Sequence, residues 1–213
     1  FNKEDVPGPC NIDDDDIKAV VKTLKSDFIT QGPTIPLFED KIKKYCGVKY
    51  GFAVNSATSA LHISCLSLGL GPGDILWTSA NTFVSSSNCA LLVGATVDFV
   101  DIDPDTLNMS VKSLEKKLIA ANNNNCLPKI VIPVHFAGQS CDMKRIYELS
   151  KIYGFKIIED GSHAIGGSYK NLPVGSCKYS DICVFSFHPV KIITTGEGGI
   201  ALTNSKLIAE KLQ

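Results

Sequence analysis

The sequence predicts an α/β fold in which a mostly parallel, seven-stranded sheet lies between layers of helices. Short apolar runs alternate along the chain with stretches of helical periodicity, which is the pattern of parallel strands joined by crossover helices. Hydrophobic residues make up 44% of the 213 residues, enough to bury a sizeable core. No internal repeat or linker divides the chain, so we expect one main domain.

The apolar runs that we expect to form strands are 51–54, 75–78, 96–101, 130–134, 155–159, 181–187 and 200–203. Apolar residues at helical spacing predict helices over 13–26, 36–45, 58–68, 83–93, 110–120 and 143–153, and one from 206 onward. In the first helix, Ile17, Val20, Val21 and Leu24 mark one apolar face. Turn-forming residues predict loops at 69–74, 103–105 and 121–125.

Residues 1–36 are predicted to be an N-terminal lead-in that contains the first helix, and residues 37–213 to be a single large domain. The chain begins at Phe1 and ends at Gln213 within a helical pattern, so we expect it to be cut at both ends.

Composition argues against several classes of function. The net charge is −1 and no basic stripe is present, so we expect neither nucleic acid nor an anionic membrane surface as a partner. No apolar run approaches the roughly 18 to 20 residues that span a bilayer, and the N-terminus is not a signal peptide. The eight cysteines lack C-x-x-C spacing, which predicts reduced thiols in a cytoplasmic protein and no metal site.

Polar residues follow several predicted strands, where the ligands of parallel sheets collect. After the strand that ends at Val54, Asn55-Ser-Ala-Thr-Ser-Ala-Leu61 opens a helix. Unpaired backbone N–H groups at such a terminus favour a phosphate, although plain N-capping by Ser56 or Thr58 explains the same residues. The chain lacks the glycine patterns of P-loop and dinucleotide-binding proteins.

Three further strand ends carry reactive or aromatic groups. Asp160 and His163 follow the strand at 155–159 and suit a metal pair, an acid–base pair or a cofactor clamp, whereas a helix-capping Asp is the simpler alternative. Phe83 follows the strand at 75–78 and is either a stacking platform or a core residue. Lys191 follows the strand at 181–187, and is either a solvated surface lysine or a nucleophile for covalent chemistry.

The combination is more specific than its parts. Pyridoxal phosphate chemistry requires a lysine that holds the aldehyde as an imine, a carboxylate that keeps the pyridine nitrogen protonated, a phosphate cradle and an aromatic plate. Lys191, Asp160, the 55–61 turn and Phe83 supply these groups, each after a different strand. The sequence therefore predicts a pyridoxal phosphate enzyme.

The same segments resemble the DegT/DnrJ/StrS sugar aminotransferases, fold-type I enzymes of the aspartate aminotransferase superfamily. The matching segments are 30–33, 38–39, 55–61, 82–83, 101–103, 159–164 and 186–199. Within the family, the Phe-His-Pro-Val-Lys run that ends at Lys191 is most similar to the branch that forms UDP-4-amino-4,6-dideoxy-N-acetyl-altrosamine. The resemblance implies the three-layer α/β/α large domain of these enzymes.

The resemblance also implies residue roles. Lys191 forms the Schiff base and moves a proton, Asp160 pairs with the pyridine nitrogen, and His163 lies beside the ring. Phe83 stacks on the ring, and the residues that hold the phosphate are Thr58, Ser59 and Ser186. The residues implied to lie near the sugar are Asp27, Phe28, Ile29, Thr30 and Ala57.

The family resemblance further implies glutamate as amino donor, a nucleotide-linked 4-keto deoxy sugar as acceptor, a ping-pong reaction and a homodimer. Some relatives carry histidine at the position of Lys191 and dehydrate sugars, so the lysine favours transamination. Family members also carry a C-terminal small domain, which we expect this chain to lack.

Two other interpretations stay open. A truncated domain that keeps the fold could act only as a binding or assembly partner, in which case glutamate would not change the cofactor's absorbance. A sugar-binding or nicotinamide-dependent α/β protein is the other interpretation, and the absence of G-x-G-x-x-G argues against the nicotinamide form.

Overall fold

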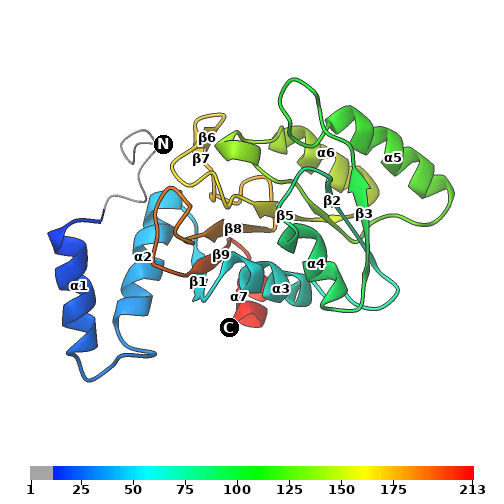
Figure 1. Cartoon of the computed structure of the whole chain (residues 1–213). Helices are drawn as coiled ribbons and strands as arrows, with labels where there is room; N and C mark the ends of the chain where they lie inside the picture. The colour runs from blue at the N-terminus through cyan, green and yellow to red at the C-terminus, as the bar shows by residue number, and fades with distance from the viewer. Residues whose placement is uncertain (1–11) are drawn as a thin grey trace.

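The computed structural model describes residues 12–213 and shows a seven-stranded sheet with helices on both faces (Figure 1). Residues 1–11, which hold the start of the predicted lead-in and Cys10, lie outside the described residues. The strand order is β1-β9-β8-β5-β4-β2-β3. The α/β class and the mostly parallel seven-stranded sheet are thereby confirmed.

The strands of the sheet match the seven predicted runs to within a few residues. They are β1 (Tyr50–Val54), β2 (Ile75–Ser79), β3 (Thr96–Val100), β4 (Ile130–Ile132), β5 (Lys156–Asp160), β8 (Ile182–Ser186) and β9 (Gly199–Thr203). β2, β3, β4, β5 and β8 pair in parallel, whereas β9 runs antiparallel to β1 and β8. The segment between β8 and β9 contains no helix, and a parallel crossover usually needs one, so the chain turns back instead.

A second, two-stranded sheet is formed by β6 (Ser168–Tyr169) and β7 (Leu172–Pro173), and no sequence pattern predicted it. Strands of two residues are too short to show an alternation of apolar and polar side chains. Lys170 and Asn171 turn the hairpin with φ of 50° and 63°.

The helices are α1 (Asp14–Leu24), α2 (Thr34–Cys46), α3 (Ala57–Ser67), α4 (Ser85–Leu91), α5 (Val111–Asn123), α6 (Met143–Tyr153) and α7 (Lys206–Leu212), with a 3-10 turn η1 (Phe136–Gly138). Side chains cap the starts of several helices: Ser56 accepts the N–H of Ser59 before α3, and Asp142 accepts that of Arg145 before α6, whereas α2 and α4 have no side-chain cap. Gly154 ends α6 with a left-handed φ of 81°. The domain boundary predicted after residue 36 falls inside the first turn of α2 and stays a prediction.

Three apolar clusters hold the layers together. α3, α4 and α7 pack on one face of the sheet in a cluster that includes Leu61, Ala90 and Leu212. On the other face, α5 and α6 cover β2, β4 and β5 through Leu118 and Ile146, and α2 covers β8 and β9. The central strands are buried on both faces, so polar side chains of this part of the sheet are found at the strand ends, where the loops carry the candidate site.

Helix α1 differs from the others because none of its residues is buried. Its start is explained by a capping box between Asp13 and Asp16. The predicted apolar face is present, but Val20 and Leu24 are 60% and 66% exposed. Within residues 12–213, no helix is long and apolar enough to cross a membrane.

Candidate active site

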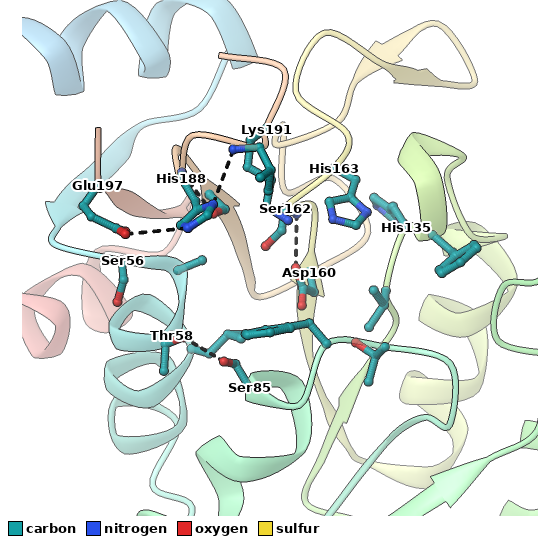
Figure 2. Close-up of a pocket in the computed structure, with 18 residues that line it drawn as sticks. Ser56, Thr58, Ser85, His135, Asp160, Ser162, His163, His188, Lys191 and Glu197 are labelled. Atoms are coloured by element: carbon teal, nitrogen blue, oxygen red, sulfur yellow. Dashed lines mark hydrogen bonds and ion pairs between the residues drawn. The ribbon is translucent and has the colours of Figure 1, made fainter. Parts of the chain in front are cut away.

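A cavity of about 330 Å³ opens at the edge of the sheet where the parallel strands end (Figure 2). Loops that follow β1, β2, β4, β5 and β8 line it. The residues predicted from the sequence that share this lining are Ala57, Thr58, Phe83, Asp160, His163, Ser186 and Lys191. Side chains separated by up to 134 positions, from Ala57 to Lys191, thus meet at one place.

One wall of the cavity is a cradle of hydroxyl groups. Helix α3 begins at Ala57, so the N–H groups of Ala57 and Thr58 lie outside the hydrogen-bond ladder of that helix, whereas the Ser56 side chain caps the N–H of Ser59. Thr58 Oγ1 lies 2.7 Å from Ser85 Oγ, which reaches the cavity from α4. Ser186, at the end of β8, lines the same space. Hydroxyls and unpaired N–H groups at a helix start suit a phosphate.

Ser59 lies outside the lining of the cavity. Its hydroxyl donates to Asn55 Oδ1 at 2.6 Å, and its N–H donates to Ser56 Oγ at 3.1 Å. The predicted contact of Ser59 with a phosphate stays a prediction, and Ser85 is the serine that lines the cavity beside Thr58.

Asp160 is the last residue of β5 and is only 4% exposed. Its carboxylate accepts two hydrogen bonds, from the N–H of Ser162 to Oδ1 at 3.1 Å and from Ser86 Oγ to Oδ2 at 2.7 Å. These donors offset the cost of burying a charged group, so an anion can be held at the cavity wall.

Lys191 lies half-buried in the turn between β8 and β9. Burial lowers the pKa of its amine, although the Asp160 carboxylate opposes the shift. Backbone hydrogen bonds fix the turn, from Lys191 N to His188 O at 2.9 Å and from Phe187 N to Gly198 O at 2.9 Å. A lysine with a lowered pKa on a fixed loop is suited to covalent chemistry with a carbonyl.

His163 and Phe83 complete the group that the sequence predicted. Burial, followed by the nearby Lys191 cation, lowers the pKa of His163, so its imidazole is neutral near pH 7. Phe83 is 71% exposed although it lines the cavity. It is therefore not a core residue, and its ring is available to a ligand.

The sequence-predicted sugar-contact residues divide into two groups. Ala57 lines the cavity. The others lie in the exposed connection between α1 and α2, do not line the cavity, and keep their role as a prediction: Asp27, Phe28, Ile29 and Thr30.

Sequence reasoning assigned no role to several residues of the lining. His188 and Glu197 flank Lys191 in the turn between β8 and β9, and their side chains face each other in Figure 2, with His188 Nε2 3.7 Å from Glu197 Oε1. The other lining residues without a predicted role include Thr82, Ser85, His135 and Ser162. His188 lies near Lys191 in the sequence and Thr82 lies next to Phe83, and this proximity was the available signal for both. The available signal for His135 was its place directly after the predicted strand 130–134.

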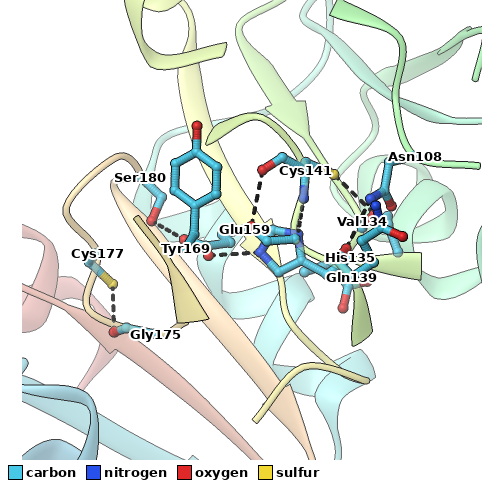
Figure 3. A network of polar contacts seen from close by, with 12 residues as sticks. Asn108, Val134, His135, Gln139, Cys141, Glu159, Tyr169, Gly175, Cys177 and Ser180 are labelled. Carbon is cyan, nitrogen blue, oxygen red and sulfur yellow. Dashed lines mark hydrogen bonds and ion pairs between the residues drawn. The ribbon is translucent and has the colours of Figure 1, made fainter. Parts of the chain in front are cut away.

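His135, which lines the cavity, belongs to a network of polar contacts (Figure 3). The N–H of Cys141 donates to His135 Nδ1 at 3.1 Å, so Nδ1 carries the lone pair and Nε2 carries the hydrogen. Nε2 then donates to Glu159 Oε1 at 2.8 Å, and Ser180 donates to Oε2 at 2.7 Å. The network ties the residue before Asp160 to the end of β4.

The donor set fits pyridoxal phosphate. The cradle around Thr58, the Asp160 carboxylate, the Lys191 amine and the exposed Phe83 ring surround one cavity and match the phosphate, nitrogen, aldehyde and ring of that cofactor. Gly199 allows the start of α3 to lie close to β9, because a Cβ at this position would lie 2.5 Å from Ala57 N and displace the cradle. Among residues 12–213, no group of three or more His, Cys, Asp or Glu side chains is placed to hold a metal ion.

The fold and the arrangement of the site are those of the large domain of fold-type I enzymes. Residues 10–213 match the model of the DegT/DnrJ/EryC1/StrS aminotransferase family, and the chain belongs to this family. The family resemblance predicted from the motifs is thereby confirmed.

Individual relatives agree with this assignment. The chain is 42% identical over 203 residues to the UDP-4-amino-4,6-dideoxy-N-acetyl-beta-L-altrosamine transaminase of Campylobacter jejuni, which carries the name of the branch predicted from the sequence. Among solved structures, Helicobacter pylori PseC, an aminotransferase of pseudaminic acid biosynthesis, is 34% identical with a TM-score of 0.88 over 96% of this chain. NtdA of Bacillus subtilis, solved with bound cofactor PMP, is 30% identical with a TM-score of 0.81 over 94% of this chain.

The chain spans only part of these proteins. The match to the Campylobacter transaminase includes 95% of this chain but only 52% of the transaminase. The structural matches include 53% of the PseC chain and 45% of the NtdA chain. The activity, substrates and partners of the whole protein therefore belong to the proposal below.

Proposed function

We propose that this protein is a pyridoxal phosphate-dependent aminotransferase that moves an amino group from glutamate to a nucleotide-linked 4-keto deoxy sugar. The observation that carries the proposal is the meeting of Lys191, Asp160, Phe83 and the Thr58–Ser85 hydroxyl pair around one cavity. The Campylobacter relative, named as a UDP-amino-sugar transaminase, supports the substrate class.

Each side chain has a role that its surroundings support. Pyridoxal phosphate, when bound, supplies an aldehyde for an amine and a ring that accepts electrons. The Lys191 amine, whose pKa is lowered by burial, would serve as the covalent attachment point for the cofactor. The same amine would act as the base that accepts and returns a proton during amino transfer. Asp160 holds the ring nitrogen, Phe83 excludes water from the ring face, and His163 stays neutral beside them.

The hydroxyl cradle gives the cofactor its anchor. Thr58, Ser85 and Ser186 donate to the phosphate together with the N–H groups at the start of α3. Ala57, which lines the cavity, is proposed to border the sugar, and the exposed 27–30 segment is proposed to approach the sugar in the assembled protein.

We also propose that the protein acts as a homodimer in the cytoplasm. Exposed apolar side chains beside the cavity support an interface, among them Val84, Val190 and Ile192. The cysteines of the described chain are all free thiols, which is the form that a reducing compartment maintains.

The experiment that tests the proposal follows the amino nitrogen. The purified protein is mixed with pyridoxal phosphate, nitrogen-labelled glutamate and a UDP-linked 4-keto-6-deoxy-N-acetylhexosamine, and the sugar product is analysed by mass spectrometry. We expect label in an amino sugar, formation of 2-oxoglutarate, and no transfer by Lys191→Ala. Bound cofactor without any response to glutamate would instead favour the alternative of a non-catalytic binding domain.

A further inference from the structure

A chain of two hydroxyl groups ends on Asp160. Ser86 lies in the first turn of α4, is fully buried, and donates to Asp160 Oδ2 at 2.7 Å. Thr82 Oγ1 lies 2.8 Å from Ser86 Oγ. An ionised carboxylate can only accept, so the Ser86 hydrogen is committed to Asp160 and the Thr82 hydroxyl donates to Ser86. The two hydroxyls therefore point in one direction, toward a single carboxylate oxygen.

The rest of the surroundings leaves Asp160 with a single orientation. Its other oxygen accepts the N–H of Ser162 at 3.1 Å, and its backbone is tied to β4 through the hydrogen bond from His135 N to Asp160 O at 3.0 Å. One donor on each oxygen restricts rotation of the carboxylate plane. Hydrogen bonds arranged in a chain also polarise one another, which strengthens the bond that Ser86 makes.

Ser86 is absent from the lining of the cavity, whereas Thr82 and Asp160 are part of it. The Ser86 hydroxyl therefore acts on a ligand only through its two partners, and the bond that it donates goes to Asp160. This separates Ser86 from the neighbouring Ser85, which lines the cavity, and from Ser87, whose hydroxyl donates to the O atom of Val84, the residue before α4, at 2.8 Å.

We propose that Ser86, supported by Thr82, is a positioning residue that holds the Asp160 carboxylate in place for the ring nitrogen of the cofactor. The inference rests on the proposed function. It adds α4 to the elements that position the carboxylate of Asp160 beside the ring nitrogen. Loss of the Ser86 hydroxyl leaves one oxygen of a buried carboxylate without its donor, which weakens the contact that Asp160 can make.

The test compares two cofactor forms. Fluorescence titration measures the affinity of the apo-protein for pyridoxal phosphate and for its deaza analogue. In the deaza analogue, carbon replaces the ring nitrogen. Ser86→Ala is expected to weaken pyridoxal phosphate binding about tenfold, the size of one charge-assisted hydrogen bond, and to leave binding of the deaza analogue within about twofold. Ser86→Thr, which keeps the hydroxyl, should retain affinity, and the matched control Ser87→Ala should change neither affinity.

Ser86→Cys serves as a second variant that nearly preserves the volume of the side chain while weakening the donor. In an Asp160→Asn background, Ser86→Ala should cause no further loss, because its effect passes through the carboxylate. Equal loss for both cofactor forms, or no loss for either, would overturn the inference and leave the proposed function intact. A wild-type protein that binds neither form would overturn both.

Discussion

At the scale of single residues, the amine of Lys191 is under two opposing influences. Burial lowers its pKa and the Asp160 carboxylate raises it, with burial the larger effect. A lysine whose pKa is lowered by folding binds fewer protons in the folded state than in the unfolded state. The free energy of unfolding therefore increases as pH rises toward 10.5, the ordinary pKa of a lysine.

This balance predicts the pH profile of chemical modification. Lys191 should be reductively methylated at lower pH than solvated lysines, and Asp160→Asn should move the profile to still lower pH because the opposing anion is gone. Peptide mass spectrometry across a pH series measures both profiles. A shift to higher pH in Asp160→Asn would show that the carboxylate does not act on the amine in this way.

Gly199 provides a second residue-scale prediction, because the cradle at the start of α3 approaches it closely. An added Cβ would lie 2.5 Å from Ala57 N, so Gly199→Ala should cost about 1–3 kcal/mol of unfolding free energy and weaken phosphate binding. Gly71→Ala is the matched control, since nothing lies within 4 Å of its Cβ position, and should cost less than about 0.5 kcal/mol. Urea unfolding measures both; equal effects would contradict the role of close approach.

At the scale of elements, the His135–Glu159 hydrogen bond joins the ends of β4 and β5. His135→Ala leaves the buried Glu159 carboxylate with Ser180 as its remaining side-chain donor, which should cost about 3–5 kcal/mol of unfolding free energy. Lys156→Ala removes a pair with Asp181 that is exposed on the lysine side and should cost less than about 1 kcal/mol. Similar costs for the two variants in urea unfolding would argue against the network as a structural tie.

The element scale also shows what sequence could predict. Lys191 and Phe83 follow apolar strands and Asp160 ends one, so the rule that ligands collect at strand ends located all three. Ser86 could not be found in that way, because it lies within α4 and its partner is 74 positions away. His135 does follow the run 130–134, but its partner Glu159 lies 24 positions away and depends on how β4 and β5 pack. The reversed direction of β9 depends on the turn before it, which apolar periodicity does not describe.

At the scale of the whole molecule, the central strands and the inner faces of the helices that cover them form the core, whereas α1 contributes no buried residue. Amide hydrogen exchange should therefore be much faster in α1 than in α3, whose Ala60, Leu61 and Cys65 are buried. Equal protection in both helices at low protein concentration would contradict the described arrangement. The apolar periodicity of α1 was visible in the sequence, but periodicity alone does not reveal whether a face is covered.

The central claim, that Lys191 is the covalent attachment point for pyridoxal phosphate, is tested most directly by trapping. The protein is mixed with pyridoxal phosphate, reduced with borohydride, digested, and its peptides are mapped by mass spectrometry. We predict that the cofactor mass is found on the peptide that contains Lys191 and is absent from Lys191→Arg. A cofactor mass spread over exposed lysines, or none on the Lys191 peptide, would contradict the account.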